Sequence, residues 1–337
     1  MTDARRLAMV LTVLAVVLTG VALAALFVGS AGLSASAVAR ALAGRAEASS
    51  VEAIVTLSLR LPRVAVAVLA GAALAVAGVG FQALTRNPLA EPSILGVSSG
   101  AAFGVVLAQI LGFQAGIVAA LGVAVFAFGG ALLAAAIVYL IAVAPGGLAV
   151  QTLLLAGVIV GIFFSAAITV IISIVDFNRL SGVIHWLLGN LAPIPAASLA
   201  LFAALAAGGV WLILNSAREL NLLALGEEAA SQLGVDAERL KRRVFVAAAL
   251  LTGTVVAFTG PIGFVGLIVP HVLRSLVGQD NRFLVPTAAL AGGAFLLAAD
   301  TLARNVVAPA ELSVGVITAF CGAPFFVWVL RTRMRPV

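Results

Sequence analysis

The chain has 337 residues, of which 63% are hydrophobic and only 9% are charged. A soluble domain carries roughly 25% charged residues, so this composition excludes a soluble globular protein. The net charge of +6 comes from basic residues at the ends of apolar runs, with no basic patch, which argues against nucleic acid as a partner.

Cysteine and histidine are scarce. A single cysteine excludes an intramolecular disulfide, and a total of one cysteine and two histidines argues against a metal cluster. We therefore expect no metal and no cofactor in this chain.

Residues 7–28 form the first apolar run, after a short polar N-terminus. The run exceeds the roughly 7–15 residues of a signal-peptide core. We therefore predict a first membrane helix, although the sequence Ser-Ala-Ser-Ala at 34–37 would suit cleavage of a signal peptide.

Nine further apolar segments follow, and all ten together predict an all-α polytopic membrane protein with about ten transmembrane helices. The nine segments are 64–84, 94–112, 116–144, 152–175, 196–214, 244–259, 262–276, 283–302 and 313–330. Gly260-Pro261 interrupts one long apolar stretch, which we interpret as two helices that meet at the membrane surface. One long kinked helix is the alternative and would give nine spans.

The distribution of Lys and Arg predicts the orientation. With the N-terminus inside, the inner side receives 13 of the 19 basic residues and the outer side six, and such a bias is typical of cytoplasmic loops. We predict a multi-pass protein of the cell (inner) membrane with both termini in the cytoplasm. Nine spans would place the arginine-rich C-terminus outside, so the bias favours ten.

The longest charged stretch, residues 215–243, divides the chain into two halves of five spans. Within it, the residues before Gly234 predict a short amphipathic helix that is too short and too charged to span. A cytoplasmic helix between two bundles is well placed to bind a partner, and a passive linker is the alternative. Two equal halves also suggest an inverted repeat, although no internal sequence match supports one.

Six strings of residues follow one another along the chain. They are RLPR at 60–63 with Gly71 and Gln82, RNPLAEP at 86–92 with ILG and SGA after it, LLLAG at 153–157, WLLG at 186–189, GFVGLIVPHVLR at 263–274, and a final set of Asp300, Arg304, Glu311, Gly315 and GAP at 322–324. In this order and spacing they resemble the FecCD-type permeases, the membrane subunits of type II ATP-binding-cassette importers for cobalamin, ferric siderophores and haem.

The resemblance implies the type II importer permease fold, with residues 1–337 as a single transmembrane permease domain and a cytoplasmic coupling loop at about 215–243. It also implies the partners, which are a second copy of the chain, two ATPase subunits inside, and a substrate-binding protein outside. Membrane lipid and a metal-chelate substrate complete the set.

Arg60, Arg63 and Arg304 lie at the outer ends of predicted spans, against the inward bias of the other basic residues. The resemblance implies that they receive glutamates of the binding protein, and a guanidinium suits bidentate pairing with a carboxylate. The alternative is that they pair with lipid phosphate or with local acids such as Asp300. Asp300 precedes Arg304 by four residues, so we expect these two to form an ion pair.

The amphipathic segment resembles the coupling loop of such importers. The residues concerned are Glu227, Glu228, Ala229, Ala230 and Gly234. The resemblance implies that they sit in a groove on the ATPase, where small alanines permit close docking and Gly234 allows the turn after the helix. No Walker motif is present, so we expect ATP and Mg²⁺ on the partner ATPase and no enzymatic activity in this chain.

The resemblance also implies a path along the dimer axis, lined by the fifth helix and gated by the loop at 145–152. The predicted path and gate residues are Val150, Gln151, Thr152, Ser165, Thr169 and Ser173. The first two differ from the small hydroxyl residues of other members, and the last three share one helix face. Their hydroxyls could instead bond to their own helix backbone.

Three further ionisable residues have weaker signals. His271 follows Pro270 within a family string, and a structural role is favoured over ligand contact or a proton relay. His185 and Arg179 lie near the outer end of the path, where either could touch an anionic substrate.

We therefore predict a homodimeric importer permease for a metal chelate, with a ferric siderophore or haem as first choice and cobalamin as alternative. An ion-coupled secondary transporter is a more distant alternative, because the acids fall in loops or at helix ends, with Asp300 as the nearest exception. A membrane-embedded enzyme would need converging His, Asp, Glu or Cys residues, which the sequence does not provide.

Overall fold

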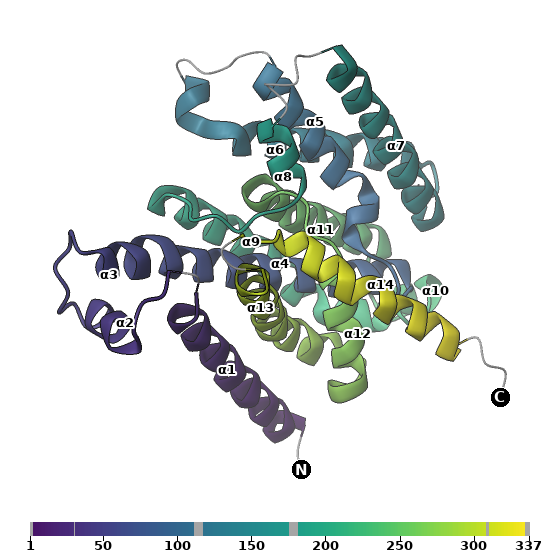
Figure 1. The fold of residues 1–337 in the computed structure, drawn as a ribbon. Coiled ribbons are helices and arrows are strands. Elements are labelled where there is room, and N and C mark those ends of the chain that lie inside the picture. The colour runs from purple at the N-terminus through teal and green to yellow at the C-terminus, as the bar shows by residue number, and fades with distance from the viewer. Residues whose placement is uncertain (1–2, 30, 111–116, 175–180, 308–309, 334–337) are drawn as a thin grey trace.

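The computed structural model describes residues 3–29, 31–110, 117–174, 181–307 and 310–333, and most of them are helical (Figure 1). All ten predicted apolar segments are found as helices, of which eight are long and apolar enough to cross a membrane and two are shorter. The ten helices are α1 (Asp3–Phe27), α4 (Leu61–Thr85), α5 (Val97–Ile110), α6 (Ile117–Ala142), α7 (Val150–Ile174), α9 (Ala196–Leu223), α11 (Ala237–Thr259), α12 (Val265–Val277), α13 (Asn281–Asn305) and α14 (Val314–Arg333). The predicted all-α polytopic fold is confirmed.

Short elements connect these helices. They are α2 (Ala35–Leu42), α3 (Val51–Ala53), the π-helix η1 (Ile54–Arg60), the 3-10 helix η2 (Pro92–Leu95), the strands β1 (Val143–Ala144) and β2 (Gly147–Leu148), α8 (Ser181–Leu187) and α10 (Glu227–Gln232). Helices α3, η1 and α4 form one continuous helix over Val51–Thr85. The second span therefore starts earlier than the apolar pattern predicts.

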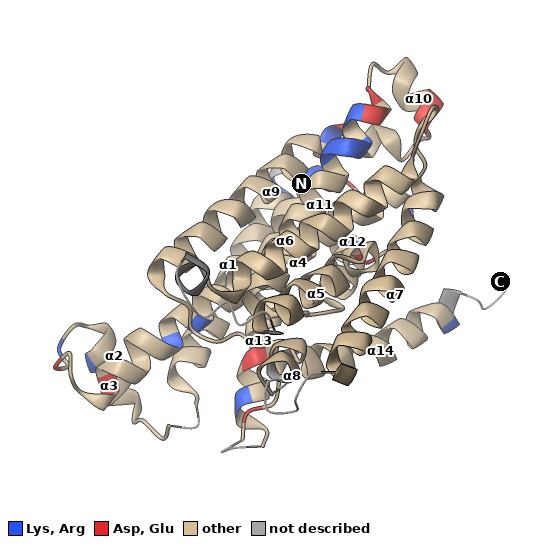
Figure 2. Cartoon of the chain, turned by 90° about the horizontal axis from the view of Figure 1, so that it is seen from above, with Lys and Arg blue, Asp and Glu red and all other residues tan. Residues whose placement is uncertain are grey.

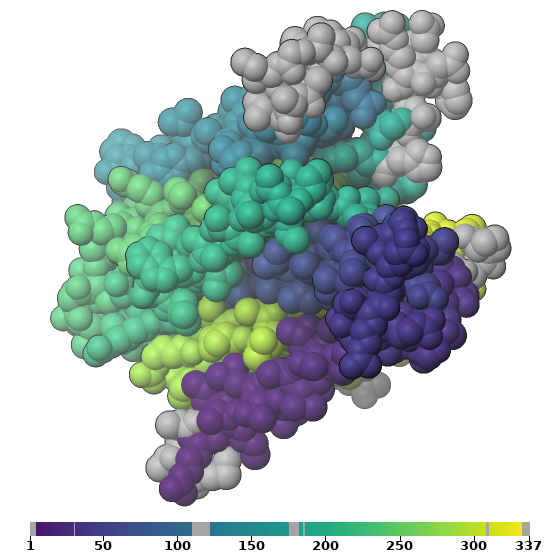
Figure 3. Space-filling view, turned by 90° about the vertical axis from the view of Figure 1, so that its left-hand side faces the viewer, coloured from purple at the N-terminus to yellow at the C-terminus, as the bar shows by residue number. Residues whose placement is uncertain are grey.

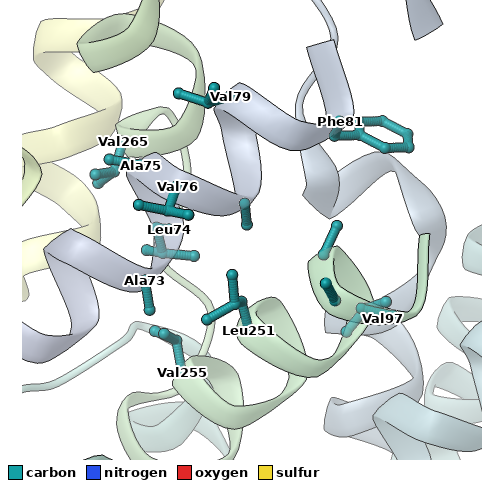
Figure 4. Packing of buried hydrophobic residues seen from close by; sticks show 14 of the residues in the cluster. Ala73, Leu74, Ala75, Val76, Val79, Phe81, Val97, Leu251, Val255 and Val265 are labelled. Atoms are coloured by element: carbon teal, nitrogen blue, oxygen red, sulfur yellow. The ribbon is translucent and has the colours of Figure 1, made fainter. Parts of the chain in front are cut away.

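Helices α4 and α11 form the centre of the bundle. Figure 1 shows α5, α6 and α7 gathered on one side of this pair and α1, α12 and α13 on the other. Figure 4 shows Leu74 and Val76 of α4 close to Leu251 and Val255 of α11 in the core. Most residues in the apolar windows of these two helices are buried, whereas few are buried in α1, α7, α9 and α14.

Glycines allow the central helices to touch through their backbones. A Cβ atom added to Gly71 or Gly78 of α4 would collide with the carbonyl oxygen of Gly292 in α13 or of Gly266 in α12. Small residues at such crossings are typical of membrane helix packing, where close backbone approach replaces the hydrophobic driving force.

The long apolar stretch after residue 243 is two helices, so the kinked-helix alternative is wrong. Helix α11 ends at Thr259 and α12 begins at Val265, after Phe264 in a left-handed conformation with φ of 69°. The N–H of Phe264 donates to the carboxylate of Glu91, which joins the second and fifth sequence strings. The connecting segment is not free at a surface, because Gly260 packs against the backbone of Trp186.

Charge gathers at the two ends of the bundle. Figure 2 shows one group around α10 and the start of α11, and another around α2, α3 and the adjoining end of α13. Figure 3 shows α1 laid against α13 at the edge of the molecule, with the 35–60 segment beside it. The two charged ends hold the predicted coupling and docking residues, respectively.

Candidate docking, coupling and gate sites

The three predicted docking arginines converge on one cavity. Arg60, Arg63 and Arg304 line a hollow of about 210 Å³ together with Glu311. The helix over Val51–Thr85 supplies two of the arginines and α13 supplies the third. The fold thus brings together residues that lie about 240 positions apart in the sequence.

Two acids of the same chain already pair with these arginines. Arg63 donates from Nη2 to Asp300 at 2.9 Å and from Nη1 to Glu311 at 2.8 Å. Nε of Arg304 lies 3.1 Å from the other oxygen of Asp300, which confirms the predicted i,i+4 ion pair. Asp300 is fully buried, whereas the side chain of Glu311 is 44% exposed. Three positive and two negative charges leave the cluster with a net positive charge.

Arg60 has a structural contact that the sequence does not reveal. Its guanidinium is buried and donates at 2.6 Å to the carbonyl oxygen of Leu26, with a second carbonyl, that of Phe27, at 3.4 Å. These are the last carbonyls of α1, and a cation at a helix C-terminus is stabilised by the helix dipole. Arg60 therefore caps α1, besides lining the cavity that it shares with Arg63 and Arg304.

The predicted coupling segment forms the six-residue helix α10 (Figure 2). Gly234 has φ of +85°, and the N–H of Val235 donates to the carbonyl of Ala230, so glycine makes the turn after the helix as predicted. Glu228 is exposed, and Ala229 is half-buried.

The orientation of Ala230 differs from the expectation. Ala230 is fully buried against its own chain, so it is not available to a groove on another protein. Its small side chain lets α10 pack closely on the bundle. The exposed residues of α10 are instead Glu228, Ser231 and Gln232, and Glu227 is half-buried.

The predicted gate loop over residues 145–152 divides between a tight hairpin and the start of α7. Strands β1 and β2 pair with Val143 opposite Leu148 and Ala144 opposite Gly147, which leaves Pro145 and Gly146 at the turn. The hairpin packs against the N-terminal end of α11, where Glu238 lines a hollow of about 360 Å³ beside it. Helix α7 starts only two residues after β2.

The predicted gate and path residues lie on α7. Val150 is its first residue and is half-buried, and Gln151 and Thr152 after it are exposed.

Ser165, Thr169 and Ser173 share an exposed face of the same helix, as predicted. The first two line a hollow of about 470 Å³ between α7 and η2. The hydroxyls of Thr169 and Ser173 each donate to the carbonyl four residues earlier, so the backbone-bonded alternative is also realised.

The remaining ionisable candidates do not join these sites. His271 lies edge-on to Phe325 with ring centroids 5.7 Å apart, and it lines a cavity of about 790 Å³ with Arg86 and Arg274. Arg179 lies outside the described residues. His185 belongs to α8. Within the part of the chain that the structure describes, no three His, Cys, Asp or Glu residues are placed to hold a metal ion.

The chain is similar to known proteins over nearly its whole length. A model of the FecCD transport family matches residues 6–332. The chain belongs to this family. It is therefore the permease of an importer of the ATP-binding-cassette class and a multi-pass membrane protein.

Three relatives illustrate the likeness. Identity is 45% over 276 residues to the cobalamin import system permease protein BtuC of Halobacterium salinarum, which covers 82% of this chain and 73% of the relative. Identity is 44% over 280 residues to the hemin transport system permease protein HmuU of Yersinia pestis, which covers 82% and 83%. A solved structure of an inward-facing metal-chelate type ABC transporter superposes with a TM-score of 0.83 at 32% identity, covering 96% of this chain and 99% of that one. The predicted importer permease fold is confirmed.

Proposed function

We propose that this FecCD-family permease carries a metal chelate across the cell (inner) membrane, with both termini in the cytoplasm. A ferric siderophore or haem is the first choice, and cobalamin is the second. Both classes have support, because similar relatives are named for hemin and for cobalamin.

Two copies of the chain form the translocation unit in this proposal. Helix α7 exposes a wide apolar face that includes Leu155, Ile162, Phe163 and Ile174. Exposed apolar surface of this extent suits either lipid or a second subunit. The hydroxyl-lined hollow on the same helix favours a second copy, because it would then face a shared path.

A binding protein docks at the arginine cavity in this proposal. The observation that carries it is the convergence of Arg60, Arg63 and Arg304 at one end of the bundle, with a surplus positive charge. A carboxylate from a binding protein can enter beside Arg63, because its neighbour Glu311 is partly exposed and can move away. Two copies would offer two such cavities, one for each lobe of the binding protein.

Two ATPase subunits bind at the opposite end, on the acidic surface of α10. ATP and Mg²⁺ are bound and used by those subunits, and this chain supplies the moving helices. A siderophore, a porphyrin and a corrin differ enough in shape for the binding protein to select among them.

The substrate is tested by uptake. Proteoliposomes that contain the permease with its ATPase, together with the binding protein from the same source, are offered haem, a ferric siderophore or cobalamin in separate reactions. We expect ATP-dependent uptake of one chelate class in excess over the others. Absence of ATP-dependent uptake for all three would overturn the proposal.

The docking site is tested with Arg63→Gln. Loss of one partner of a close charge pair costs about 2–5 kcal/mol, so affinity for the binding protein should fall by about 30-fold or more. Arg40→Gln is the matched control, since Arg40 pairs with Glu52 at an exposed site on the same side of the molecule. Equal affinity of both variants and the unmodified protein would contradict the docking assignment, provided that the ATPase remains attached.

A further inference from the structure

Lys241 is the single lysine among the 19 basic residues of the chain. It lies in the second turn of α11, and only 4% of its side chain is exposed. The neighbouring Arg239 has a side chain that is 76% exposed. Burial of a cation near the end of a helix is costly unless all its charge is compensated, so its partners indicate what the residue does.

The ammonium group of Lys241 contacts three separate elements. It donates to the carbonyl of Leu148 in β2 at 3.0 Å and to the carboxylate of Glu227, the first residue of α10, at 3.1 Å. It also pairs with the carboxylate of Glu238 in its own helix. An ammonium has three divergent donors, and here each has an acceptor.

Glu238 closes the link to the hairpin. Its carboxylate accepts the N–H of Leu148 at 2.7 Å, so both backbone polar groups of that buried residue are bound to the start of α11. Gly147, with φ of +107°, lies so close that an added Cβ atom would collide with the Glu238 carboxylate. The hairpin is therefore in direct contact with both Lys241 and Glu238.

A lysine suits this place better than an arginine. A guanidinium is planar and directs its donors in a fork, whereas an ammonium is compact and directs three donors away from one point. The three acceptors here come from three different elements, so a point-like cation is required. This accounts for the one lysine in a chain that otherwise uses arginine.

We propose that Lys241, with Glu238, is the positioning residue that couples the ATPase-facing helix α10 to the gate hairpin over residues 143–148. Movement of α10 by the ATPase displaces Glu227, and Lys241 transmits the displacement to Leu148. Helix α7 begins two residues later, so the hairpin carries the motion to the predicted path. The inference rests on the proposed function, because it assigns how the ATPase-binding helix of that function communicates with the gate loop predicted from the sequence.

The test uses Lys241→Met, which keeps length and apolar volume but removes all three contacts. Arg243→Met is the matched control, since Arg243 lies two residues further along α11 and makes a partly exposed pair with Glu219 at 3.4 Å. Three properties of the assembled transporter are measured. They are ATPase attachment, ATP hydrolysed per chelate transported, and the effect of nucleotide on thiol labelling of Ala149→Cys in a Cys321→Ser background, which removes the single cysteine.

We expect Lys241→Met to retain the ATPase and to hydrolyse ATP, but to use several-fold more ATP for each chelate transported. Labelling of Ala149→Cys, directly after the hairpin, should no longer depend on nucleotide. Arg243→Met should match the unmodified protein in both respects. Unchanged coupling and nucleotide-dependent labelling in Lys241→Met would overturn the inference.

Two further results distinguish a failure of assembly and a wrong gate prediction from a failure of the coupling inference itself. If Lys241→Met does not assemble, Glu227→Gln decides the question, because it weakens the link to α10 alone and leaves Lys241 paired with Glu238. Unchanged coupling in Glu227→Gln would then refute the inference. If labelling of Ala149→Cys does not depend on nucleotide when only Cys321→Ser accompanies it, the gate loop predicted from the sequence is wrong.

Discussion

Asp300 offers a sharp test of the buried charge cluster. Its carboxylate is fully buried and pairs with Arg63 at 2.9 Å and with Arg304 at 3.1 Å. Asp300→Asn keeps the shape and removes the charge. Arg304 then has no ion pair left within the described residues, and Arg63 keeps only Glu311. Breaking a buried pair by removing one partner costs about 3–5 kcal/mol.

The matched control is Glu52→Gln. Glu52 pairs with Arg40 at 2.9 Å, but the two side chains are 31% and 51% exposed, and an exposed pair contributes about 0–1 kcal/mol. Both pairs lie at the same end of the molecule, so they differ mainly in burial.

Unfolding of the purified protein in mixed micelles, followed by circular dichroism during titration with a denaturing detergent, measures the difference. We expect Asp300→Asn to unfold at a clearly lower detergent fraction than Glu52→Gln. Adding Arg304→Met to Asp300→Asn should recover part of the loss, because it removes the unpaired buried cation. Equal stability of Asp300→Asn and Glu52→Gln would refute the reasoning.

Three other predictions concern stability and assembly. Gly78→Ala should lower stability by about 1–3 kcal/mol through overpacking, whereas Gly208→Ala, which has no atom within 4 Å, should be neutral or gain up to about 1 kcal/mol in the same titration. The pKa of Asp280 is lowered to about 2, chiefly by the hydrogen bond from Arg282, so its carboxylate stabilises the folded protein fully above its ordinary pKa of 3.8 and loses this effect as pH falls towards 2. The difference in stability between Asp280→Asn and the unmodified protein should therefore shrink as pH falls through that range. A difference that stays constant would contradict the assignment. Ala230→Leu should detach α10 from its own bundle and so reduce co-purification of the ATPase. Unchanged co-purification would contradict this expectation and show that the buried position tolerates a larger residue.

The ten helices follow from the sequence because apolar runs of span length have few alternatives in a bilayer. Gly260-Pro261 marks the break between α11 and α12 correctly, since neither residue continues a helix well. The start of the second span is not visible in the same way. Polar residues such as Thr56 and Arg60 interrupt the apolar pattern there, yet the helix continues through a π-helical turn from Val51.

The site is only partly visible in the sequence. The i,i+4 pair of Asp300 and Arg304 is local and follows from helix geometry. Long-range partners carry no local signal, which is why the contact of Arg60 with the end of α1 is absent from the pattern. The inward direction of Ala230 likewise depends on how α10 packs. That Lys241 is the single lysine of the chain marks it as unusual in the sequence. Its contact with Leu148 could not be predicted, because Leu148 lies 93 residues earlier.

The energy source is the central claim, and transport in proteoliposomes tests it most directly. The permease with its ATPase is reconstituted together with the cognate binding protein, and chelate uptake is measured with ATP, without ATP, and with an imposed proton or sodium gradient alone. An ATP-driven importer should accumulate chelate only with both ATP and the binding protein. Uptake driven by an ion gradient without ATP would contradict the account and favour a secondary transporter.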